Sequence, residues 1–198
     1  AIAHAHFRPA FARALAERLA PMLVAELADL AGDGAASSEP PLLVSSPALR
    51  CRQTAGAIAG GLGLGPDAIG LEAGLLEIDY GDWDGLTADE CRARDPQLRA
   101  AWKADPFATR CPGGESGADV ARRSRAVMAP IEEWLAGEPS RTAVVVAHNH
   151  VNRLRLCDLF GWPMRDYRRR LIQSPAGVNI VWFGRGGPVL RCVNVQPA

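Results

Sequence analysis

The sequence predicts an α/β protein of one domain, residues 1–198, built as a three-layer α/β/α sandwich on a mostly parallel sheet. Two short apolar runs, Leu42–Val44 and Ala143–Ala147, have the composition of buried strands. A turn and then a helical segment follow each run, and this alternation indicates parallel strands joined by helical crossovers. The chain is long enough to bury most of its apolar surface in one domain.

The composition is that of an ordinary soluble globular protein, with 48% hydrophobic and 22% charged residues. Lys plus Arg equals Asp plus Glu at 22 each, so no charge excess favours nucleic acid or a membrane surface as a partner. No apolar run approaches ~20 residues, and we expect neither a membrane span nor a signal peptide. The five cysteines lack CxxC spacing, which is typical of reduced thiols in a cytoplasmic protein.

The first part of the chain predicts helix and then linker. Residues 1–6 fit either a stub of strand or the front of a helix. From Phe11, leucines recur at i+4 and i+8 and predict one helix face, which Pro21 kinks or restarts. The Gly, Ser and Pro residues of 32–41 indicate a surface linker.

The triplet Ser45-Ser46-Pro47 ends the first buried strand and begins a helix. We expect Ser46 to cap that helix, Pro47 to take its first position and the glycines at 60 and 61 to end it. Arg50 then lies in the first turn, near the positive end of the helix dipole. A bound anion would stabilise a cation there, and solvation explains it equally well. Ligands bind at such carboxyl ends of strands in open α/β sheets.

A strand region and a helix are expected next. Ile69–Ile78 predicts the strand region, which ends in an acidic loop. Thr87 and Glu90 have the spacing of a capping box and predict a helix over 88–104, with Trp102 as its anchor in the core.

The second half of the chain continues the alternation. Cys111–Gly117 predicts a loop, and an amphipathic helix over 118–136 follows, interrupted at Pro130. A helix over 151–160 is expected to end at Gly161.

Two strands close the chain. They are expected at 178–183 and 189–195, and the Gly-rich turn between them predicts a hairpin at the sheet edge.

Two residues are candidates for chemistry from their positions. His148 directly follows the clearest buried strand, at the edge of the sheet where ligands collect. The alternative for His148 is a histidine hydrogen-bonded in the core. Glu77 is one acid in a run of four, and by itself a solvated acidic loop explains it better.

Four segments resemble motifs of the histidine phosphatase superfamily, also called the phosphoglycerate mutase-like family. They are Ser45–Ala55, Leu75–Gly85, Pro112–Ser116 and Val144–Arg153. Cys51 is a small departure in the first, and Asn149 and His150 stand where glycines are usual in the last. The resemblance spans most of the chain and implies a phosphoglycerate mutase-like fold.

The resemblance also implies catalytic roles. His148 would hydrogen-bond the transferring phosphoryl group, and Arg50 and Asn149 would bind phosphate. Glu77 would protonate the leaving alkoxide and later activate water. A phosphate beside this carboxylate should raise its pKa, which suits an acid.

Further contacts to substrate are implied by the same comparison. Glu115 and Ser116 would read substrate hydroxyls, and Arg153 would also bind substrate. The expected partner is a small phosphorylated metabolite, and neither a cofactor nor a metal is expected. Homodimer formation stays open.

The front of the chain departs from the family. The family's nucleophile lies in an Arg-His-Gly segment, which occurs nowhere here, and the nearest candidate is His4, between two alanines. Three interpretations remain: the nucleophile precedes Ala1, His4 is a degraded but working nucleophile, or the protein has lost phosphoryl transfer and kept the pocket.

Three functions are therefore considered. The first is a metal-independent phosphomonoester hydrolase that acts through a phosphohistidine. The second is a pseudo-phosphatase that binds a phosphorylated ligand without turning it over. The third is a metal hydrolase built on the His-x-His pairs at 4/6 and 148/150 with Glu77 or Asp79.

The segment Met164–Gln173 carries a local density of arginines in a chain of zero net charge. We expect Arg168 and Arg169 to be solvated. Arg165 or Arg170 is expected to hold the non-reacting anionic end of a substrate and so to set substrate choice.

Overall fold

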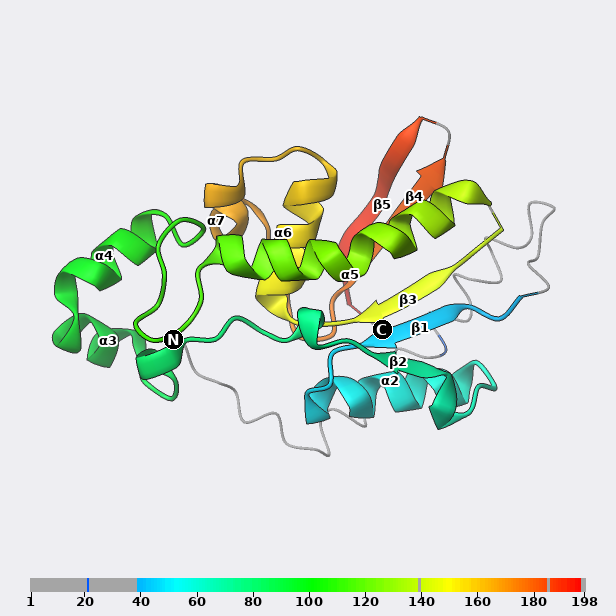
Figure 1. The fold of residues 1–198 in the computed structure, drawn as a ribbon, viewed down its shortest axis with the longest axis horizontal. Helices are drawn as coiled ribbons and strands as arrows, with labels where there is room; N and C mark the ends of the chain where they lie inside the picture. The colour runs from blue at the N-terminus through cyan, green and yellow to red at the C-terminus, as the bar shows by residue number, and fades with distance from the viewer. Residues whose placement is uncertain (1–20, 22–38, 139, 185, 197–198) are drawn as a thin grey trace.

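A computed structural model describes residues 21, 39–138, 140–184 and 186–196 (Figure 1). The predicted N-terminal helix and His4 lie outside the described residues. The elements in chain order are β1 (Leu42–Ser45), α2 (Leu49–Gly61), β2 (Ile69–Leu71), α3 (Ala88–Arg94), α4 (Pro96–Ala104), α5 (Gly117–Gly137), β3 (Ala143–Val146), α6 (Asn149–Leu159), α7 (Tyr167–Arg170), β4 (Val178–Gly184) and β5 (Gly187–Val195).

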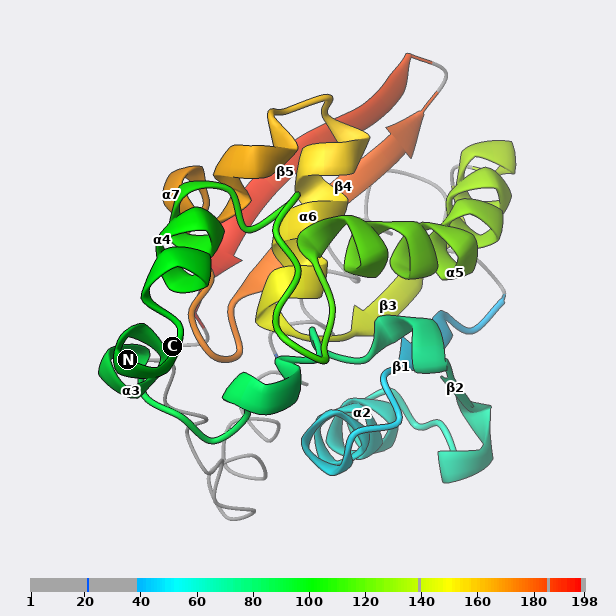
Figure 2. The ribbon, with the colours of Figure 1, turned by 60° about the vertical axis from the view of Figure 1, so that its left-hand side comes forward.

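The centre of the fold is a parallel sheet in the order β2-β1-β3. Side chains alternate across it because successive residues of a strand point to opposite faces. Val44 packs in the cluster that α5 and α6 contribute to, whereas Leu43 packs with Ile58 of α2. Helix α2 accordingly lies on one side of the sheet and α5 and α6 on the other (Figures 1 and 2). This arrangement confirms the predicted three-layer sandwich on a parallel sheet.

The turn after β1 differs from the prediction. The helix begins at Leu49, two residues later than expected, and Ala48 rather than Ser46 is its N-cap residue. No side chain caps it. Local propensity favours Ser46 as a cap, but its hydroxyl bonds across the sheet edge to His148 instead.

The predicted strand region 69–78 is mostly not a strand. Strand β2 ends at Leu71, and a 3-10 turn over Ala73–Leu75 carries the chain toward α5. A Cβ on Gly74 would lie 2.5 Å from Val127 and 2.8 Å from the carbonyl oxygen of Arg123, so the backbone is in direct contact with that helix. The extended chain then crosses the carboxyl edge of the sheet.

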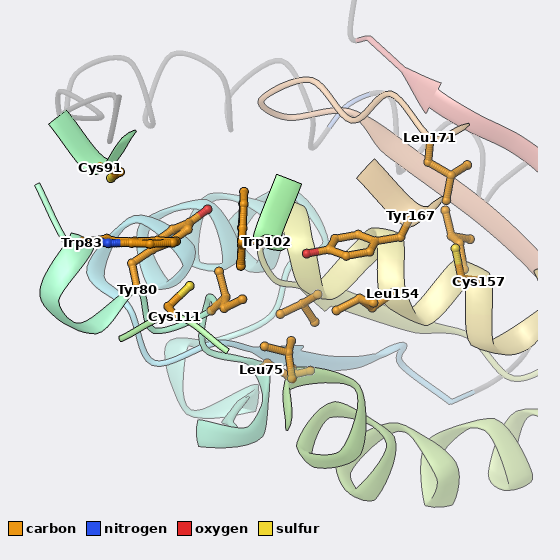
Figure 3. Close-up of a cluster of buried hydrophobic side chains, with 14 of the residues drawn as sticks. Leu75, Tyr80, Trp83, Cys91, Trp102, Cys111, Leu154, Cys157, Tyr167 and Leu171 are labelled. Carbon is orange, nitrogen blue, oxygen red and sulfur yellow. The ribbon is translucent and has the colours of Figure 1, made fainter. Parts of the chain in front are cut away.

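The predicted helix 88–104 forms as two helices, α3 and α4, which meet at Asp95. Pro96 fits the first position of a helix but cannot continue one, which explains the break. The capping box of Thr87 and Glu90 is confirmed, and Trp102 is fully buried. Figure 3 shows how the aromatic rings of Tyr80, Trp83 and Trp102 pack toward Tyr167.

The later elements follow the prediction with two exceptions. Helix α5 runs through Pro130, which is exposed, so water can reach the carbonyl that the proline leaves unpaired. Helix α6 ends before Gly161, whose φ is +62°, as expected. Strands β4 and β5 pair as the predicted antiparallel hairpin, but in the described residues they form a sheet of their own.

The five cysteines are all free thiols, and four of them are buried. Within the part of the chain that the structure describes, no helix is both long and apolar enough to cross a membrane.

Candidate active site

Strands β1 and β3 are neighbours in register, so the residues that follow them meet at the carboxyl edge of the sheet. His148 Nε2 lies 2.8 Å from Ser46 Oγ, and His148 Nδ1 lies 2.8 Å from Arg50 Nη2. A guanidinium can only donate, so Nδ1 must be the acceptor. The proton of the neutral ring is therefore on Nε2, which donates to the Ser46 hydroxyl.

His148 is a neutral base at physiological pH. Burial of the ring is the main cause of a pKa lowered to about 4; the charge of Glu77 opposes the shift and the charge of Arg50 adds to it. Arg50 itself is exposed, so its guanidinium is hydrated and accessible to an anion from solvent. The pair presents one fixed positive charge and one oriented imidazole at the sheet edge.

Cys51 is a neighbour of His148 that the sequence analysis noted only as a departure from the family motif. Its Sγ lies 3.5 Å from His148 Nε2 and 3.6 Å from the carbonyl oxygen of Ala147. Burial raises the pKa of the Cys51 thiol to about 11, despite the nearby Arg50. A protonated thiol is a poor nucleophile, so Cys51 packs against the imidazole without competing for its chemistry.

Glu77 lies across the same edge. Its Oε1 accepts from the backbone N–H of Ile78 at 3.1 Å and of His150 at 3.3 Å, and it faces His150 Nδ1 at 3.4 Å. Burial alone would raise its pKa, but the contacts with His150, the ring of His148 and the Ile78 amide outweigh burial and lower the pKa to about 2. The predicted rise concerns a carboxylate beside phosphate, whereas in the free protein the groups around Glu77 are donors and not anions and lower its pKa.

His150 links Glu77 to an aromatic layer. The ring is buried, its Nε2 lies 3.3 Å from the Tyr80 hydroxyl, and it meets the rings of Tyr80 and Tyr167 edge-on at 5.8 and 5.7 Å. The two rings of the predicted His-x-His pair thus face different partners. Among the described residues, no three His, Cys, Asp or Glu side chains are grouped as metal ligands.

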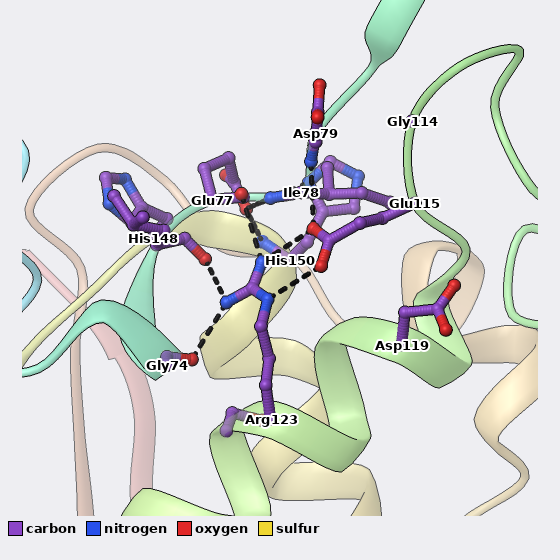
Figure 4. A network of polar contacts seen from close by, with 12 residues as sticks. Gly74, Glu77, Ile78, Asp79, Gly114, Glu115, Asp119, Arg123, His148 and His150 are labelled. Carbon is purple, nitrogen blue, oxygen red and sulfur yellow. Dashed lines mark hydrogen bonds and ion pairs between the residues drawn. The ribbon is translucent and has the colours of Figure 1, made fainter.

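Arg123 on α5 fixes the segment that carries Glu77 (Figure 4). Its Nε and Nη2 each donate to one carboxylate oxygen of Glu115 at 2.8 Å. Its remaining bonds go to three backbone carbonyls, those of Gly74 at 2.8 Å, Leu76 at 2.6 Å and Glu77 at 3.1 Å. Sequence reasoning missed Arg123, since one more arginine on a polar helix face carries no distinguishing signal.

The two side chains that were expected to read substrate hydroxyls are engaged within the protein. Glu115 also accepts from the backbone N–H of Asp79 at 3.0 Å. Ser116 is the N-cap of α5 and forms a capping box with Asp119. Their contacts hold the loop and the helix, which in turn hold Glu77.

The glycines of the 112–116 motif let its backbone approach the backbone of residues 79–82 closely. A Cβ on Gly114 would lie 2.3 Å from the carbonyl oxygen of Asp79, and one on Gly81 would lie 2.2 Å from that of Pro112. Two backbone hydrogen bonds cross the same contact, Asp82 N–H to Pro112 and Glu115 N–H to Asp79, both at 2.8 Å. Two of the family-like segments therefore interlock directly.

Asn149 and Arg153 follow His148 on α6. Asn149 donates through Nδ2 to the carbonyl oxygen of Gln173 at 2.7 Å. Arg153 is half-buried and its Nε has no hydrogen-bond partner. Burial lowers the pKa of Arg153, and the charge of Arg168 lowers it further.

The arginine-rich segment differs from the expectation at one residue. Arg165 and Arg170 are exposed, and Arg170 Nε donates to Asp166 at 3.2 Å. Arg169 is exposed and donates to a backbone carbonyl. The prediction that Arg168 is solvated is wrong, because its guanidinium carbon lies 4.5 Å from the centre of the Trp102 ring and the side chain is half-buried.

Comparison with known families gives one extensive match. The sequence profile described as the histidine phosphatase superfamily (branch 1) matches residues 12–196. A glucosyl-3-phosphoglycerate phosphatase of Mycobacterium tuberculosis is 41% identical over 116 residues, which are 56% of this chain and 50% of that protein. An acid phosphatase of the same species is 30% identical over 161 residues, covering 80% of this chain and 71% of the relative. The chain thus matches about half the length of the first of these relatives.

Solved structures agree in fold. A protein described as mycobacterial hydrolase 2 superposes with a TM-score of 0.72 at 28% identity, covering 94% of this chain and 78% of the other. A mycobacterial glucosyl-3-phosphoglycerate phosphatase in complex with inorganic phosphate superposes with a TM-score of 0.70 at 30% identity, covering 94% and 84%.

Proposed function

The chain belongs to the histidine phosphatase superfamily (branch 1), and from this membership we propose that it hydrolyses a phosphomonoester of a small metabolite without a metal ion. The observation that carries the proposal is the imidazole of His148, held between Arg50 and Ser46 at the sheet edge and close enough to Glu77 for their charges to interact. A fixed cation, an oriented N–H donor and a carboxylate are the groups that phosphoryl transfer needs.

The reaction proceeds in two displacements. A histidine nitrogen attacks phosphorus, the bond to the leaving oxygen breaks, and Glu77 gives that oxygen a proton. Water then attacks the phosphohistidine, its proton passes to Glu77, and inorganic phosphate and free histidine result. We assign the nucleophile to His4, which lies outside the described residues.

Each of the other site groups has a separate task. Arg50 binds the phosphoryl oxygens through a charge-assisted contact, and His148 Nε2–H exchanges Ser46 for a phosphoryl oxygen. Glu77 is ionised in the free protein. A phosphate dianion placed beside it raises its pKa, so that substrate binding itself recruits the proton that the leaving group takes up.

The first experiment measures turnover of 4-nitrophenyl phosphate with and without EDTA. We expect hydrolysis that EDTA does not change and that His148→Ala and His4→Ala remove. Absence of turnover above the His148→Ala control would overturn the hydrolase. Turnover that survives in His4→Ala would move the nucleophile to another residue.

The pseudo-phosphatase is the second candidate, because no Arg-His-Gly segment occurs in the chain. Binding without turnover distinguishes it. Inorganic phosphate should raise the Tm, and Arg50→Ala should reduce the shift. Arg52→Ala, which removes the same charge from an exposed position of α2, is the matched control and should keep the shift. A shift with no turnover selects the pseudo-phosphatase.

A further inference from the structure

Three arginines from three elements converge on one buried aromatic cluster. Arg99 comes from α4, Arg153 from α6 and Arg168 from α7. The guanidinium carbons of Arg99 and Arg168 lie 4.8 and 4.5 Å from the centre of the Trp102 ring. Arg168 is close enough to the other two for its charge to lower the pKa of both Arg99 and Arg153. Each of the three side chains is half-buried, so solvent still reaches the cluster.

Several polar atoms of this cluster have no hydrogen-bond partner within the part of the chain that the structure describes. The Nε atoms of all three arginines and Nη1 of Arg99 are buried without a hydrogen bond, and so is the hydroxyl of the fully buried Tyr167. None of the three arginines forms an ion pair among the described residues. The acid nearest to Arg168 in the sequence, Asp166, pairs instead with Arg169 and Arg170, which are exposed.

Such an arrangement is unfavourable unless something else binds there. A buried donor without an acceptor loses its hydrogen bonds to water and gains none in return, and the loss is larger when the donor is charged. Like charges that are partly removed from water also repel more strongly than on an open surface. Contact with the face of the Trp102 ring offsets some of this cost. The ring face does not, however, supply an acceptor for the N–H groups that lie in the plane of a stacked guanidinium. An anion would satisfy both the donors and the charges.

We propose that Arg99, Arg153, Arg168 and the Tyr167 hydroxyl form a second anion subsite, which binds an oxyanion of the substrate remote from the phosphate that is hydrolysed. The substrate part of this inference rests on the proposed function. Carboxylate and phosphate groups share the required chemistry, since either offers several acceptor oxygens to separate N–H donors. The subsite therefore selects phosphomonoesters that carry a second acidic group.

The position of the subsite fits that role. Tyr80 contacts His150 through its hydroxyl at 3.3 Å, and its ring lies 6.2 Å from that of Trp102. Tyr167 lies on the other side of Trp102, with its hydroxyl directed toward that ring (Figure 3). The Tyr167 ring also meets the His150 ring edge-on at 5.7 Å, and Arg153 is close enough to Glu77 for that carboxylate to affect its pKa. The subsite thus adjoins the residues around Glu77.

The test compares three aryl phosphates that differ at one position: 4-nitrophenyl phosphate, 4-carboxyphenyl phosphate and 1,4-phenylene bisphosphate. Arg168→Met and Arg99→Met keep the side-chain stem over Trp102 and remove the charge. Each should raise KM by about tenfold or more for the substrates with a second anion, with kcat within about twofold, and should leave the nitro compound unchanged. A response of the carboxylate or of the bisphosphate alone identifies the anion. Arg92→Met, on an exposed arginine of α3 with 66% side-chain exposure, is the matched control.

A binding arm separates failure of the subsite from failure of the hydrolase. In the Arg50→Ala background, where the phosphoryl site is disabled, citrate or inorganic phosphate should still raise the Tm. Addition of Arg168→Met should remove that shift, and addition of Arg92→Met should not. This result stands even if no substrate is turned over. Equal kinetic losses on all three aryl phosphates, or a Tm shift that Arg168→Met and Arg99→Met leave intact, would overturn the subsite.

Discussion

His150 occupies the second position of α6, and its contacts set the charge state of the nearby carboxylate. Its ring nitrogen and its backbone N–H both face Glu77, and its other nitrogen faces Tyr80. A glycine, the residue usual in the family motif, would keep only the backbone contact. The side chain is therefore one of the departures from the family motif at this site, beside Cys51 and Asn149.

We predict that His150→Gly raises the pKa of Glu77 by about one unit or more. The variant removes the ring whose Nδ1 lies 3.4 Å from Glu77 Oε1 and which lowers the pKa, while burial, which raises it, remains. NMR titration of side-chain-labelled glutamate measures the shift. His150→Gln, which retains an amide donor, should give a smaller one. An unchanged pKa in His150→Gly would mean that the Ile78 amide and His148 are sufficient.

At the scale of elements, Arg123 ties α5 to the segment that carries Glu77. We expect Arg123→Met to lower kcat by about ten- to a hundredfold with little change in KM, because Glu77 loses its position and Glu115 is left half-buried without a cation. Arg122→Met, which changes an exposed neighbour with 74% side-chain exposure, is the control. A loss of less than about threefold in a folded Arg123→Met variant would show that the backbone holds Glu77 without help.

The contact between the 79–82 and 112–114 segments gives a prediction about stability. Gly81 and Gly85 both have positive φ, +54° and +76°, but only Gly81 has backbone atoms within reach of a Cβ, the closest at 2.2 Å. Gly85→Ala therefore suffers backbone strain alone, of order 1 kcal/mol. Gly81→Ala adds a clash that cannot relax and should lower the free energy of unfolding by on the order of 2–4 kcal/mol more. Urea denaturation of both variants compares them, and equal losses would contradict the interlock.

Elements with local signals were predictable from the sequence. The capping box at Thr87, the glycine after α6 and the Gly-rich hairpin turn each depend on residues within a few positions. The prediction that Ser46 caps a helix is wrong for the opposite reason. Its hydroxyl bonds to His148, 102 positions away, and local sequence rules do not consider such distant contacts.

The contacts of the candidate site also divide into those that the sequence predicts and those that it does not. Arg50 and His148 follow adjacent parallel strands, so topology alone predicts their meeting. Arg123, the ring contacts of His150 and the inward turn of Arg168 depend on helices that pack from other parts of the chain. Periodicity gives no indication of these contacts, and for Arg168 it favoured solvent.

For the whole molecule, two buried groups make stability fall on acidification. His148 has a pKa of about 4 against an ordinary 6.5, so between these values the unfolded chain binds a proton that the folded protein excludes. Glu77 has a pKa of about 2 against an ordinary 4.5, and it extends the fall below pH 4.5. Stability contributed by both groups is complete above pH 6.5.

We predict a decline in the free energy of unfolding of roughly 3 kcal/mol between pH 6.5 and 4, the scale of the His148 shift. Urea unfolding at a series of pH values measures it. His148→Gln should flatten the curve over this range and keep the decline below pH 4.5. A wild-type curve that is flat down to pH 5 would contradict the burial of a neutral imidazole.

The distribution of free thiols also gives a way to follow local opening. Cys51 lies at the carboxyl edge of the sheet, Cys91 on α3, Cys111 in the loop after α4 and Cys157 on α6, and burial raises the pKa of each. A buried, protonated thiol reacts with a disulfide reagent only after its region opens, so its rate reports that region's opening free energy. We expect the partly exposed Cys192 to be labelled first. Mass spectrometry of each labelled peptide over time would then rank the region of α3 and α4, the carboxyl edge of the sheet and α6 by how often each one opens to solvent.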